Sequence, residues 1–197
     1  MLSVKETPTG VSFFLFFRKE IIRFAERKKD MGRKDIKIHG DYVAFWNGPF
    51  SNYYPCLFSA YRKLWYSSEQ CFMWLKAKYF KDEETALAIE NAPNPSFAKQ
   101  LGREVKNFDE AKWQKVRYKR MYEAVFNKFA QNEDLLRELL SDKYKDKHFV
   151  EGSPYDRIWG VGIKWTDKAI ADKDNWRGEN LLGAVLDDVR EKLMMEK

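Results

Sequence analysis

The run YSSEQCFMWLKAKYF, residues 66–80, places an acid and an amine on one side of a predicted helix. Glu69 and Lys76 are two helical turns apart, about 10.5 Å along the axis, and Phe72 and Phe80 recur at helical spacing on the same side. A carboxylate and an amine on an otherwise aromatic face could both contact one small ligand. The alternative is that Glu69 stabilises the helix N-terminus, where negative charge is favourable, and that Lys76 extends into solvent.

A second group of candidate residues lies in FVEGSPYDRIWGVGI, residues 149–163. Two carboxylates, Glu151 and Asp156, flank a Gly-Ser-Pro turn, and Trp159 precedes the first of two glycines, Gly160 and Gly162. Glycines beside a tryptophan allow the backbone to approach a ligand closely. They are equally common in ordinary tight turns, so spacing alone leaves both interpretations open.

Several classes of site are excluded by residue type. The chain has no Gly-rich phosphate loop and no G-x-S-x-G motif. Its two histidines are far apart in the sequence, which argues against a Ser-His-Asp triad. Two cysteines and two histidines that do not cluster also argue against a zinc site. We expect neither a metal nor a redox cofactor.

Length and composition indicate one folded domain of ordinary size, or a domain with an extension. The chain has 197 residues, of which 44% are hydrophobic and 34% charged. Its formal net charge is +6, and residues 18–37 hold nine basic residues against four acidic ones. This segment is either a nucleic-acid contact or a solvated helix face. The same alternatives apply to a second basic run, Lys112, Lys115, Arg117, Lys119 and Arg120.

No run approaches the roughly 18 apolar residues that a transmembrane helix needs. The apolar run VSFFLFF, residues 11–17, lacks both a preceding basic segment and a following small-residue cleavage site. We therefore expect no membrane contact, a cytoplasmic protein, and reduced thiols at Cys56 and Cys71.

The predicted elements are mainly helices, with a small β element near the N-terminus. Residues 12–29 read as an amphipathic helix whose aromatic start could equally be a strand, and residues 36–38 and 42–45 read as a hairpin. An aromatic loop follows over 45–55 and an irregular or partly extended stretch over 148–165. Capping residues and periodicity predict helices over about 68–80, 83–90, 95–102, 109–130, 134–140 and 181–194.

Seven motifs in order resemble the NADAR, or YbiA-like, family. They are FSNYYP (50–55), YSSEQCFMWLKAKYF (66–80), AKQLGREV (98–105), the helix with Trp113, Arg117 and Met121, KFAQNEDLLRELL (128–140), VEGSPYDRIWGVG (150–162) and GENLLGAVLDDVR (178–190). FSNYYP departs conservatively from the more usual FSNFYP. The resemblance spans roughly residues 42–193, so we predict a basic extension over 1–35 and a single multihelical catalytic domain over 36–197.

The resemblance implies a mainly helical enzyme that hydrolyses N-glycosidic bonds. Members of the family remove ADP-ribose from the amino group of guanine in nucleic acid, and others cleave a ribosylamino-pyrimidine phosphate of the riboflavin pathway. By matching positions, the implied catalytic residues are Glu69, Trp113 and Asp156, with Lys76 as a further candidate. The predicted substrate-binding residues are Trp46, Asn47, Phe50, Ser51, Asn52, Tyr53, Arg103, Glu151, Trp159, Gly160 and Gly162.

The residue types suit this chemistry independently. A carboxylate stabilises the positive charge that develops at the anomeric carbon, and a second acidic group protonates the departing amine or activates water. A ribosylamine can also open to an imine that Lys76 could attack to form a Schiff base. Tryptophan and tyrosine rings could stack on a base, and Arg103 or a lysine of the second basic run could hold a phosphate.

Three hypotheses remain open on the sequence. The first is removal of ADP-ribose from guanine in nucleic acid, with an ADP-ribosyltransferase toxin as a candidate partner and the basic extension as a candidate nucleic-acid contact. The second is cleavage of a small ribosylamino-pyrimidine phosphate. The third is a non-catalytic module that binds nucleic acid or ADP-ribose. The sequence does not divide roles among Glu69, Asp156 and Lys76.

Overall fold

Most helices begin where the sequence supplies a capping side chain. The computed structural model describes residues 35–196, so the predicted helix over 12–29 and the predicted extension, apart from Asp35, lie outside the described residues. Side-chain oxygens cap four helices, through Ser67 before α2 (Ser68–Tyr79), Asp82 before α3 (Glu83–Glu90), Asn94 before α4 (Pro95–Arg103) and Asp109 before α5 (Glu110–Ala130). These caps satisfy backbone N–H groups of the first turn. The predicted boundaries are confirmed within one or two residues.

Asn180 stands before the last helix, α7 (Leu181–Met195), but its side chain does not cap it. Its backbone is left-handed, at φ 56°. The side chain instead donates to the carbonyl oxygen of Phe149 at 2.9 Å and accepts the N–H of Glu151 at 3.0 Å. Asn180 therefore joins the start of α7 to the strand β5 (His148–Glu151). The short helix α6 (Glu133–Leu139) likewise begins after Asn132 without a side-chain cap bond.

The described strands form two small sheets. The predicted hairpin is confirmed as β1 (Ile36–His39) paired antiparallel with β2 (Tyr42–Phe45). β5 adds to β2 in parallel, with Phe45 opposite Glu151, so the strand order is β1-β2-β5. A second hairpin, β3 (Phe58–Ala60) with β4 (Lys63–Trp65), was not predicted. Its turn holds Tyr61 and Arg62 in the left-handed region instead of glycine.

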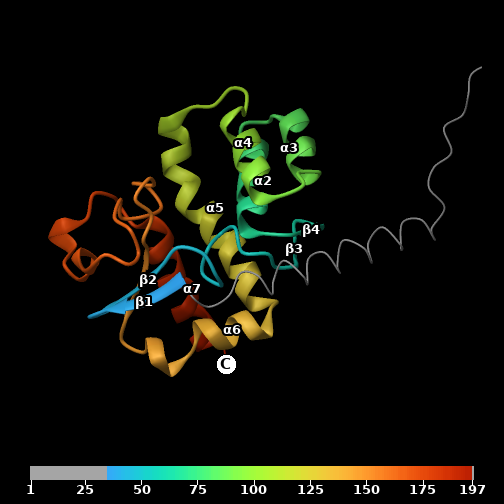
Figure 1. Ribbon diagram of the computed structural model, residues 1–197. Helices are drawn as coiled ribbons and strands as arrows, with labels where there is room; N and C mark the ends of the chain where they lie inside the picture. Colours follow the sequence, from blue (N-terminus) through green and yellow to red (C-terminus); the bar gives the residue numbers. More distant parts are fainter. Residues whose placement is uncertain (1–34, 197) are drawn as a thin grey trace, which may run out of the picture.

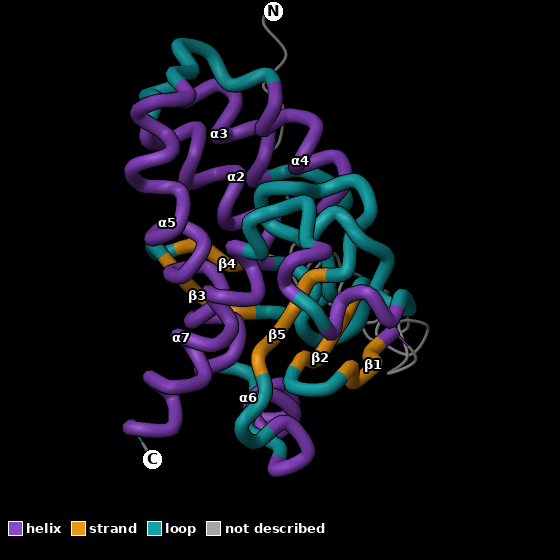
Figure 2. Tube along the Cα trace, turned by 90° about the vertical axis from the view of Figure 1, so that its left-hand side faces the viewer, coloured by secondary structure: helices purple, strands orange, loops and turns teal. Residues whose placement is uncertain are grey.

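Figures 1 and 2 show that the long helix α5 joins the group formed by α2, α3 and α4 to the part of the fold that holds α7 and the three-stranded sheet. Helices α2, α3 and α4 pack together beside one half of α5, and α7 packs against both α5 and β5. Loops and short 3-10 turns, η3 (Lys168–Ala171) and η4 (Lys173–Asn175), cover the outer side of the three-stranded sheet, and η2 (Asp142–Tyr144) precedes β5. The prediction of a mainly α domain with a small β element is confirmed.

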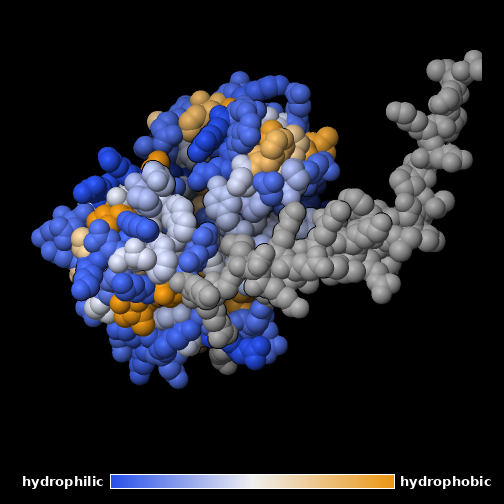
Figure 3. All heavy atoms as spheres, viewed as in Figure 1, coloured by the Kyte–Doolittle hydropathy of each residue, from blue (hydrophilic) through white to orange (hydrophobic). Residues whose placement is uncertain are grey.

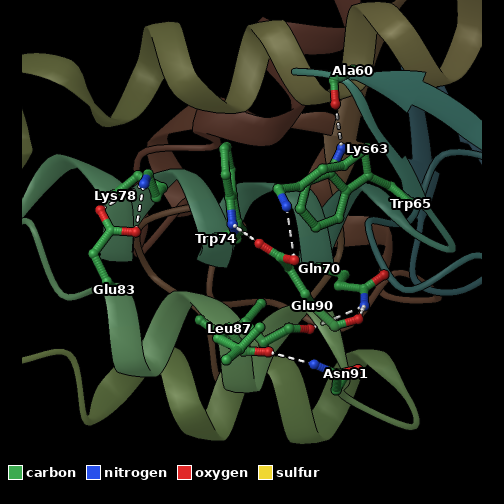
Figure 4. A network of polar contacts seen from close by, with 11 residues as sticks. Ala60, Lys63, Trp65, Gln70, Trp74, Lys78, Glu83, Leu87, Glu90 and Asn91 are labelled. Atoms are coloured by element: carbon green, nitrogen blue, oxygen red, sulfur yellow. Dashed lines mark hydrogen bonds and ion pairs between the residues drawn. The ribbon is translucent and has the colours of Figure 1, made fainter. Parts of the chain in front are cut away.

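A polar network fixes α2 against its neighbours (Figure 4). The Glu90 carboxylate accepts Trp74 Nε1 and Lys63 Nζ, each at 2.8 Å, and Gln70 Nε2 donates to the Ile89 carbonyl oxygen at 3.0 Å. The Trp74 ring lies 5.3 Å from that of Trp65. Since the contacts tie α2 to α3 and to the β3–β4 hairpin, they set the rotation of α2 and with it the direction of its other side chains.

None of the helices within residues 35–196 is long and apolar enough to cross a membrane. On the face seen in Figure 3, apolar residues form small separate groups within a hydrophilic surface. Cys56 and Cys71 are both buried and are not joined in a disulfide, and burial raises the pKa of Cys71.

Candidate active site

Glu69 lies in the first turn of α2 and is 4% exposed. Its backbone N–H donates to the carbonyl oxygen of Asn52 at 3.1 Å, which joins the FSNYYP loop to the helix start. The Asn52 side chain strengthens this link, because its Oδ1 accepts Ser68 Oγ at 2.9 Å and its Nδ2 donates to Met121 Sδ at 3.0 Å. Asn52 was predicted to bind substrate. Its buried amide holds the loop on α2 and α5, and its role in substrate binding stays a prediction.

Lys99 and Asp156 bring α4 and the loop after β5 together. Lys99 Nζ lies 3.8 Å from Asp156 Oδ2. The other oxygen, Asp156 Oδ1, accepts the N–H groups of Ile158 at 3.0 Å and Trp159 at 2.8 Å. The two N–H donors fix the carboxylate in the loop and leave Oδ2 as the oxygen that faces the lysine.

Glu151 ends β5, with its backbone fixed on both sides. Its N–H donates to Asn180 Oδ1 at 3.0 Å and its carbonyl oxygen accepts the N–H of Val161 at 3.0 Å. Its side-chain oxygen Oε2 is buried and has no hydrogen-bond partner within the described residues. A buried side-chain oxygen without a hydrogen-bond partner is unusual in a native protein.

The charges of these residues act on one another. Burial raises the pKa of Glu69 to about 6, with Asp156 raising it further while Lys99 and Arg103 oppose the shift. Burial also raises the pKa of Glu151 to about 8, with Asp156 and Glu69 adding to the effect and Lys99 opposing it. Burial disfavours the charged form of Lys99, but the surrounding carboxylates outweigh this and raise its pKa. Three acidic side chains, Glu69, Glu151 and Asp156, therefore interact electrostatically with the one lysine, Lys99.

Tyr53 borders the same group. The ammonium of Lys99 lies 5.6 Å from the centre of its ring. Burial raises the pKa of Tyr53 to about 12, and the charge of Glu69 raises it further. Arg103, exposed in the last turn of α4, lowers the pKa of both Tyr53 and Glu69. The predicted substrate residues Tyr53 and Arg103 are therefore electrostatically coupled to Glu69.

A cluster of rings continues from Glu69 along α2. Phe72 packs edge-on against Trp159 at 5.2 Å and lies 5.4 Å from Trp113. Trp113 is 6% exposed, whereas Trp159 is half-buried. Asp156 and Trp159 share a turn, so the ring cluster and the acidic group meet at that loop.

Lys76 has different neighbours from Lys99. Its Nζ donates to the Gly102 carbonyl oxygen at 2.7 Å and lies 4.0 Å from the centre of the Phe108 ring. Burial lowers its pKa, and the charge that opposes this shift comes from Glu110. Lys99, which the sequence prediction missed, is the lysine that faces the carboxylates. The AKQLGREV motif contains it, but nothing in its spacing indicated that it would face Glu69.

Phe50, one of the predicted substrate-binding residues, lies in the hydrophobic core. It is 1% exposed, and its ring lies 4.5 Å from that of Phe149 in the core. Ser51, also buried, uses its Oγ to accept the N–H of Tyr53 at 3.2 Å. Trp46 and Asn47 are half-buried in the loop after β2, where the N–H of Trp46 donates to the Asp35 carbonyl oxygen at 3.2 Å.

The two predicted glycines have conformational reasons to be glycine. A Cβ at Gly160 would lie 2.8 Å from the Glu151 carbonyl oxygen and 3.1 Å from that of Asp156. Gly162 has φ +69°, and a Cβ there would lie 2.9 Å from Arg177 Cβ. These glycines let the loop close tightly around Glu151 and Asp156.

Three of the five residues of the second basic run form ion pairs within the protein. Arg117 is buried and pairs with Glu179 at 3.2 Å and Glu110 at 3.6 Å. Lys112 pairs with Asp109 at 3.2 Å, and Arg120 with Glu123 at 2.9 Å. Arg117 therefore joins α5 to the segment before α7, and the solvated-face interpretation does not apply to it. Over residues 35–196, no three His, Cys, Asp or Glu side chains are grouped so as to hold a metal.

Comparison with known proteins identifies the family. Residues 44–194 match the NADAR domain model. The chain is 40% identical over 160 residues to Protein irg-1 of Caenorhabditis elegans (73% of this chain, 74% of that protein). It is 35% identical over 148 residues to N-glycosidase R617 of Acanthamoeba polyphaga mimivirus (73% and 86%).

A solved structure supports the same assignment. The NMR structure of YbiA from E. coli superposes with a TM-score of 0.65 at 26% identity, covering 84% of this chain and 92% of that one. A riboflavin biosynthesis protein of Vibrio vulnificus, VVA0006, is 31% identical over 147 residues, 75% of this chain but 36% of its own length. The relatives named N-glycosidases, with the family match, make the chain a hydrolase of N-glycosidic bonds. The chain belongs to the NADAR domain family.

Proposed function

We propose that the protein removes ADP-ribose from the amino group of guanine bases in nucleic acid. The observation that carries the chemistry is the pair of carboxyl groups of buried Glu69 and half-buried Glu151, whose pKa values lie on opposite sides of neutrality, at about 6 and about 8. Carboxyl groups with separated pKa values allow one site to hold a carboxylate and a carboxylic acid together. Hydrolysis of an N-glycosidic bond needs both.

The carboxylates stabilise the ribosyl cation as the C–N bond lengthens. In an ionised state, Glu69 offers its charge in a buried site, where an electrostatic interaction is stronger than in water. Asp156 is held rigidly by two N–H donors and can add a second negative charge without reorganisation. A water molecule that attacks the anomeric carbon gives its proton to a carboxylate, and Glu69 is the candidate base.

A site that binds ADP-ribose and a base needs cationic side chains for the phosphates and aromatic rings that stack on the base or ribose. Arg103 is exposed and close enough to Glu69 and Tyr53 to shift their pKa values, so it can hold a phosphate beside the reacting carbon. Trp159 and Tyr53 are half-buried rings at the same group of residues and can stack on a base or a ribose. These features suit both candidate substrates, ADP-ribosylated nucleic acid and a small ribosylamino-pyrimidine phosphate.

Lys76 provides a covalent alternative for the same reaction. Burial lowers its pKa, which favours the neutral amine that attacks a carbon–nitrogen double bond. In this route the ribosylamine opens to an imine, Lys76 Nζ adds to its carbon, and the guanine amine leaves. Water then hydrolyses the resulting Schiff base. Borohydride reduction during turnover would attach the sugar to the wild type and not to Lys76→Arg if this route operates, and would attach it to neither if it does not.

The test of the proposal is release of ADP-ribose from guanine-ADP-ribosylated single-stranded DNA. Wild type, Glu69→Gln and the exposed control Glu191→Gln are compared at equal concentration. We expect release by wild type and Glu191→Gln and a large loss in Glu69→Gln. Failure of all three to release ADP-ribose would overturn the proposal for this substrate.

The second candidate substrate is a ribosylamino-pyrimidine phosphate, favoured by the similarity to the riboflavin biosynthesis protein of Vibrio vulnificus. The same three proteins are assayed on it in parallel. A substrate that wild type cleaves at least a hundredfold faster than the other is assigned as the preferred one. A protein that binds ADP-ribosylated DNA but cleaves neither substrate, with Glu69→Gln binding equally well, would indicate the non-catalytic module.

A further inference from the structure

We propose that Glu151 is the general acid, whose carboxyl group protonates the nitrogen that leaves the ribose carbon. The proposal rests on hydrolysis of an N-glycosidic bond and not on which base the substrate carries. The family resemblance assigns Glu151 only to the substrate pocket, so the acid role is an addition to the residues implied above.

The first argument is the buried oxygen without a partner. Among the buried side-chain nitrogen and oxygen atoms of residues 35–196, Glu151 Oε2 is the one that lacks a hydrogen-bond partner. Leaving such an atom unpaired costs about 1–3 kcal/mol, so a native site retains one where a ligand completes the bond. A carboxylic acid at this position can donate a hydrogen bond and then its proton to the leaving nitrogen.

The second argument is rigidity. The backbone of Glu151 is fixed by Asn180 on its N–H side and by Val161 and Ser153 on its carbonyl side. Gly160 packs against the same carbonyl oxygen so closely that a Cβ would lie 2.8 Å from it. A proton donor must be within hydrogen-bond reach of the departing atom, and these contacts hold the backbone that carries the Glu151 side chain in place without help from the substrate.

The third argument is the state of the proton. Burial and the negative charges of Asp156 and Glu69 favour the neutral form of Glu151 and raise its pKa to about 8, so the acid is present at neutral pH. Lys99 opposes this effect without cancelling it. The other two carboxyl groups suit the role less. Asp156 Oδ1 already accepts two backbone N–H groups and its Oδ2 faces Lys99, and the pKa of Glu69 is raised only to about 6.

The reaction balances with these assignments. The C–N bond breaks with its electron pair going to nitrogen, and nitrogen takes the proton of Glu151. Water forms the new bond to the anomeric carbon and gives a proton to Glu69. Proton exchange with solvent then restores the acid at Glu151 and the carboxylate at Glu69, so no co-reactant besides water is consumed.

The test compares Glu151→Gln with wild type and Glu191→Gln on the substrate that wild type cleaves. General acid catalysis contributes roughly 10²- to 10⁴-fold, so we expect kcat to fall by that factor while KM changes less. The wild-type rate falls at alkaline pH as Glu151 loses its proton, and this fall is absent from the residual rate of Glu151→Gln. A rate within threefold of wild type with the alkaline fall intact would overturn the proposal.

A second measurement does not depend on the substrate or on the folding of that variant. Carboxyl-carbon NMR of wild type with labelled glutamate follows each side chain with pH, and the Glu151→Asp spectrum identifies the Glu151 resonance. We expect that resonance to titrate well above the ordinary glutamate range. Titration near the ordinary glutamate value of 4.5 would overturn the proposal even if no substrate were cleaved. If only the proposed function is wrong, the Glu151 resonance still titrates well above the ordinary glutamate range while the wild-type enzyme is inert.

Discussion

Lys99 Nζ on α4 lies 3.8 Å from Asp156 Oδ2 in the loop after β5. This ion pair joins two of the segments that form the candidate site. The FSNYYP loop and α2 join through the hydrogen bond from the Glu69 N–H to the Asn52 carbonyl oxygen. The acidic side chains thus come from two segments: Glu69 from α2, and Glu151 and Asp156 from the end of β5 and the loop that follows it. A lysine from α4 balances part of their charge.

Replacing Glu69 with glutamine removes the candidate base and one negative charge beside the developing cation. We expect kcat/KM to fall by roughly 10²- to 10⁴-fold. Because burial raises the pKa of Glu69 to about 6, the wild-type rate should fall as pH drops below that value. The measurement is kcat/KM from pH 5 to 9. A variant that kept the acidic fall would show that another group causes it.

Replacing Lys99 with methionine removes the cation that lowers the pKa of Glu69 and Glu151. Both carboxyl groups should then hold their protons to higher pH, so the acidic limb of kcat/KM should shift upward. Lys99→Arg keeps the charge and should leave that limb near its wild-type position. Lys106→Met, at an exposed lysine that pairs with Glu84, serves as the control. Identical profiles for Lys99→Met and this control would contradict the assignment.

The folding stability should depend on pH through Glu69 and Glu151. Their folded-state pKa values are about 6 and about 8, both above the ordinary glutamate value of 4.5. The folded state therefore binds more protons than the unfolded state in this range, and the free energy of unfolding should fall as pH rises from about 4.5 to about 8. Urea unfolding at several pH values measures this slope. The Glu69→Gln/Glu151→Gln double variant should flatten it, and an unchanged slope would mean that other groups are responsible.

Lys128 is 1% exposed and donates from Nζ to the Ser51 carbonyl oxygen at 2.8 Å. It holds the FSNYYP loop against α5, while burial lowers its pKa to about 8. A charged lysine in this position costs stability at neutral pH, and this cost is relieved as pH rises from about 8 toward 10.5. We expect Lys128→Met to keep or raise Tm at pH 7 and to lower kcat/KM severalfold, because the loop beside Glu69 loosens. Thermal unfolding and kinetics on the same samples check both. A lower Tm with unchanged kcat/KM would contradict this role.

Gly160→Ala should disturb the site without changing a chemical group. The new Cβ would lie 2.8 Å from the Glu151 carbonyl oxygen and 3.1 Å from that of Asp156, so the loop must shift. We expect kcat/KM to fall at least tenfold. Gly40→Ala is an informative comparison, because that glycine has open space around its Cβ position but a φ of +59°. Its substitution should lower Tm and leave kcat/KM near wild type.

The helix boundaries and the first hairpin could be predicted because their causes are local. Ser67, Asp82, Asn94 and Asp109 cap the turns that directly follow them. The β3–β4 hairpin escaped prediction because its turn places Tyr61 and Arg62 in the left-handed region, where Asn-Gly would have been the recognisable sequence. β5 was expected only as partly extended. Its pairing with β2 joins segments far apart in the chain, which periodicity does not reveal.

By itself, the sequence determined the helical framework, the family and the residue types of the site, because capping, periodicity and ordered motifs depend on neighbouring residues. Only the tertiary structure decided which charges meet. Helical spacing put Lys76 on the side of Glu69, yet Lys99 from another helix is the lysine whose charge acts on that carboxylate. Phe50 and Arg117 are both buried. The pKa of a carboxyl group depends on burial and on charges within a few ångströms. These are set by packing between distant segments, so the proton state of Glu151 could not be predicted from its place in the sequence.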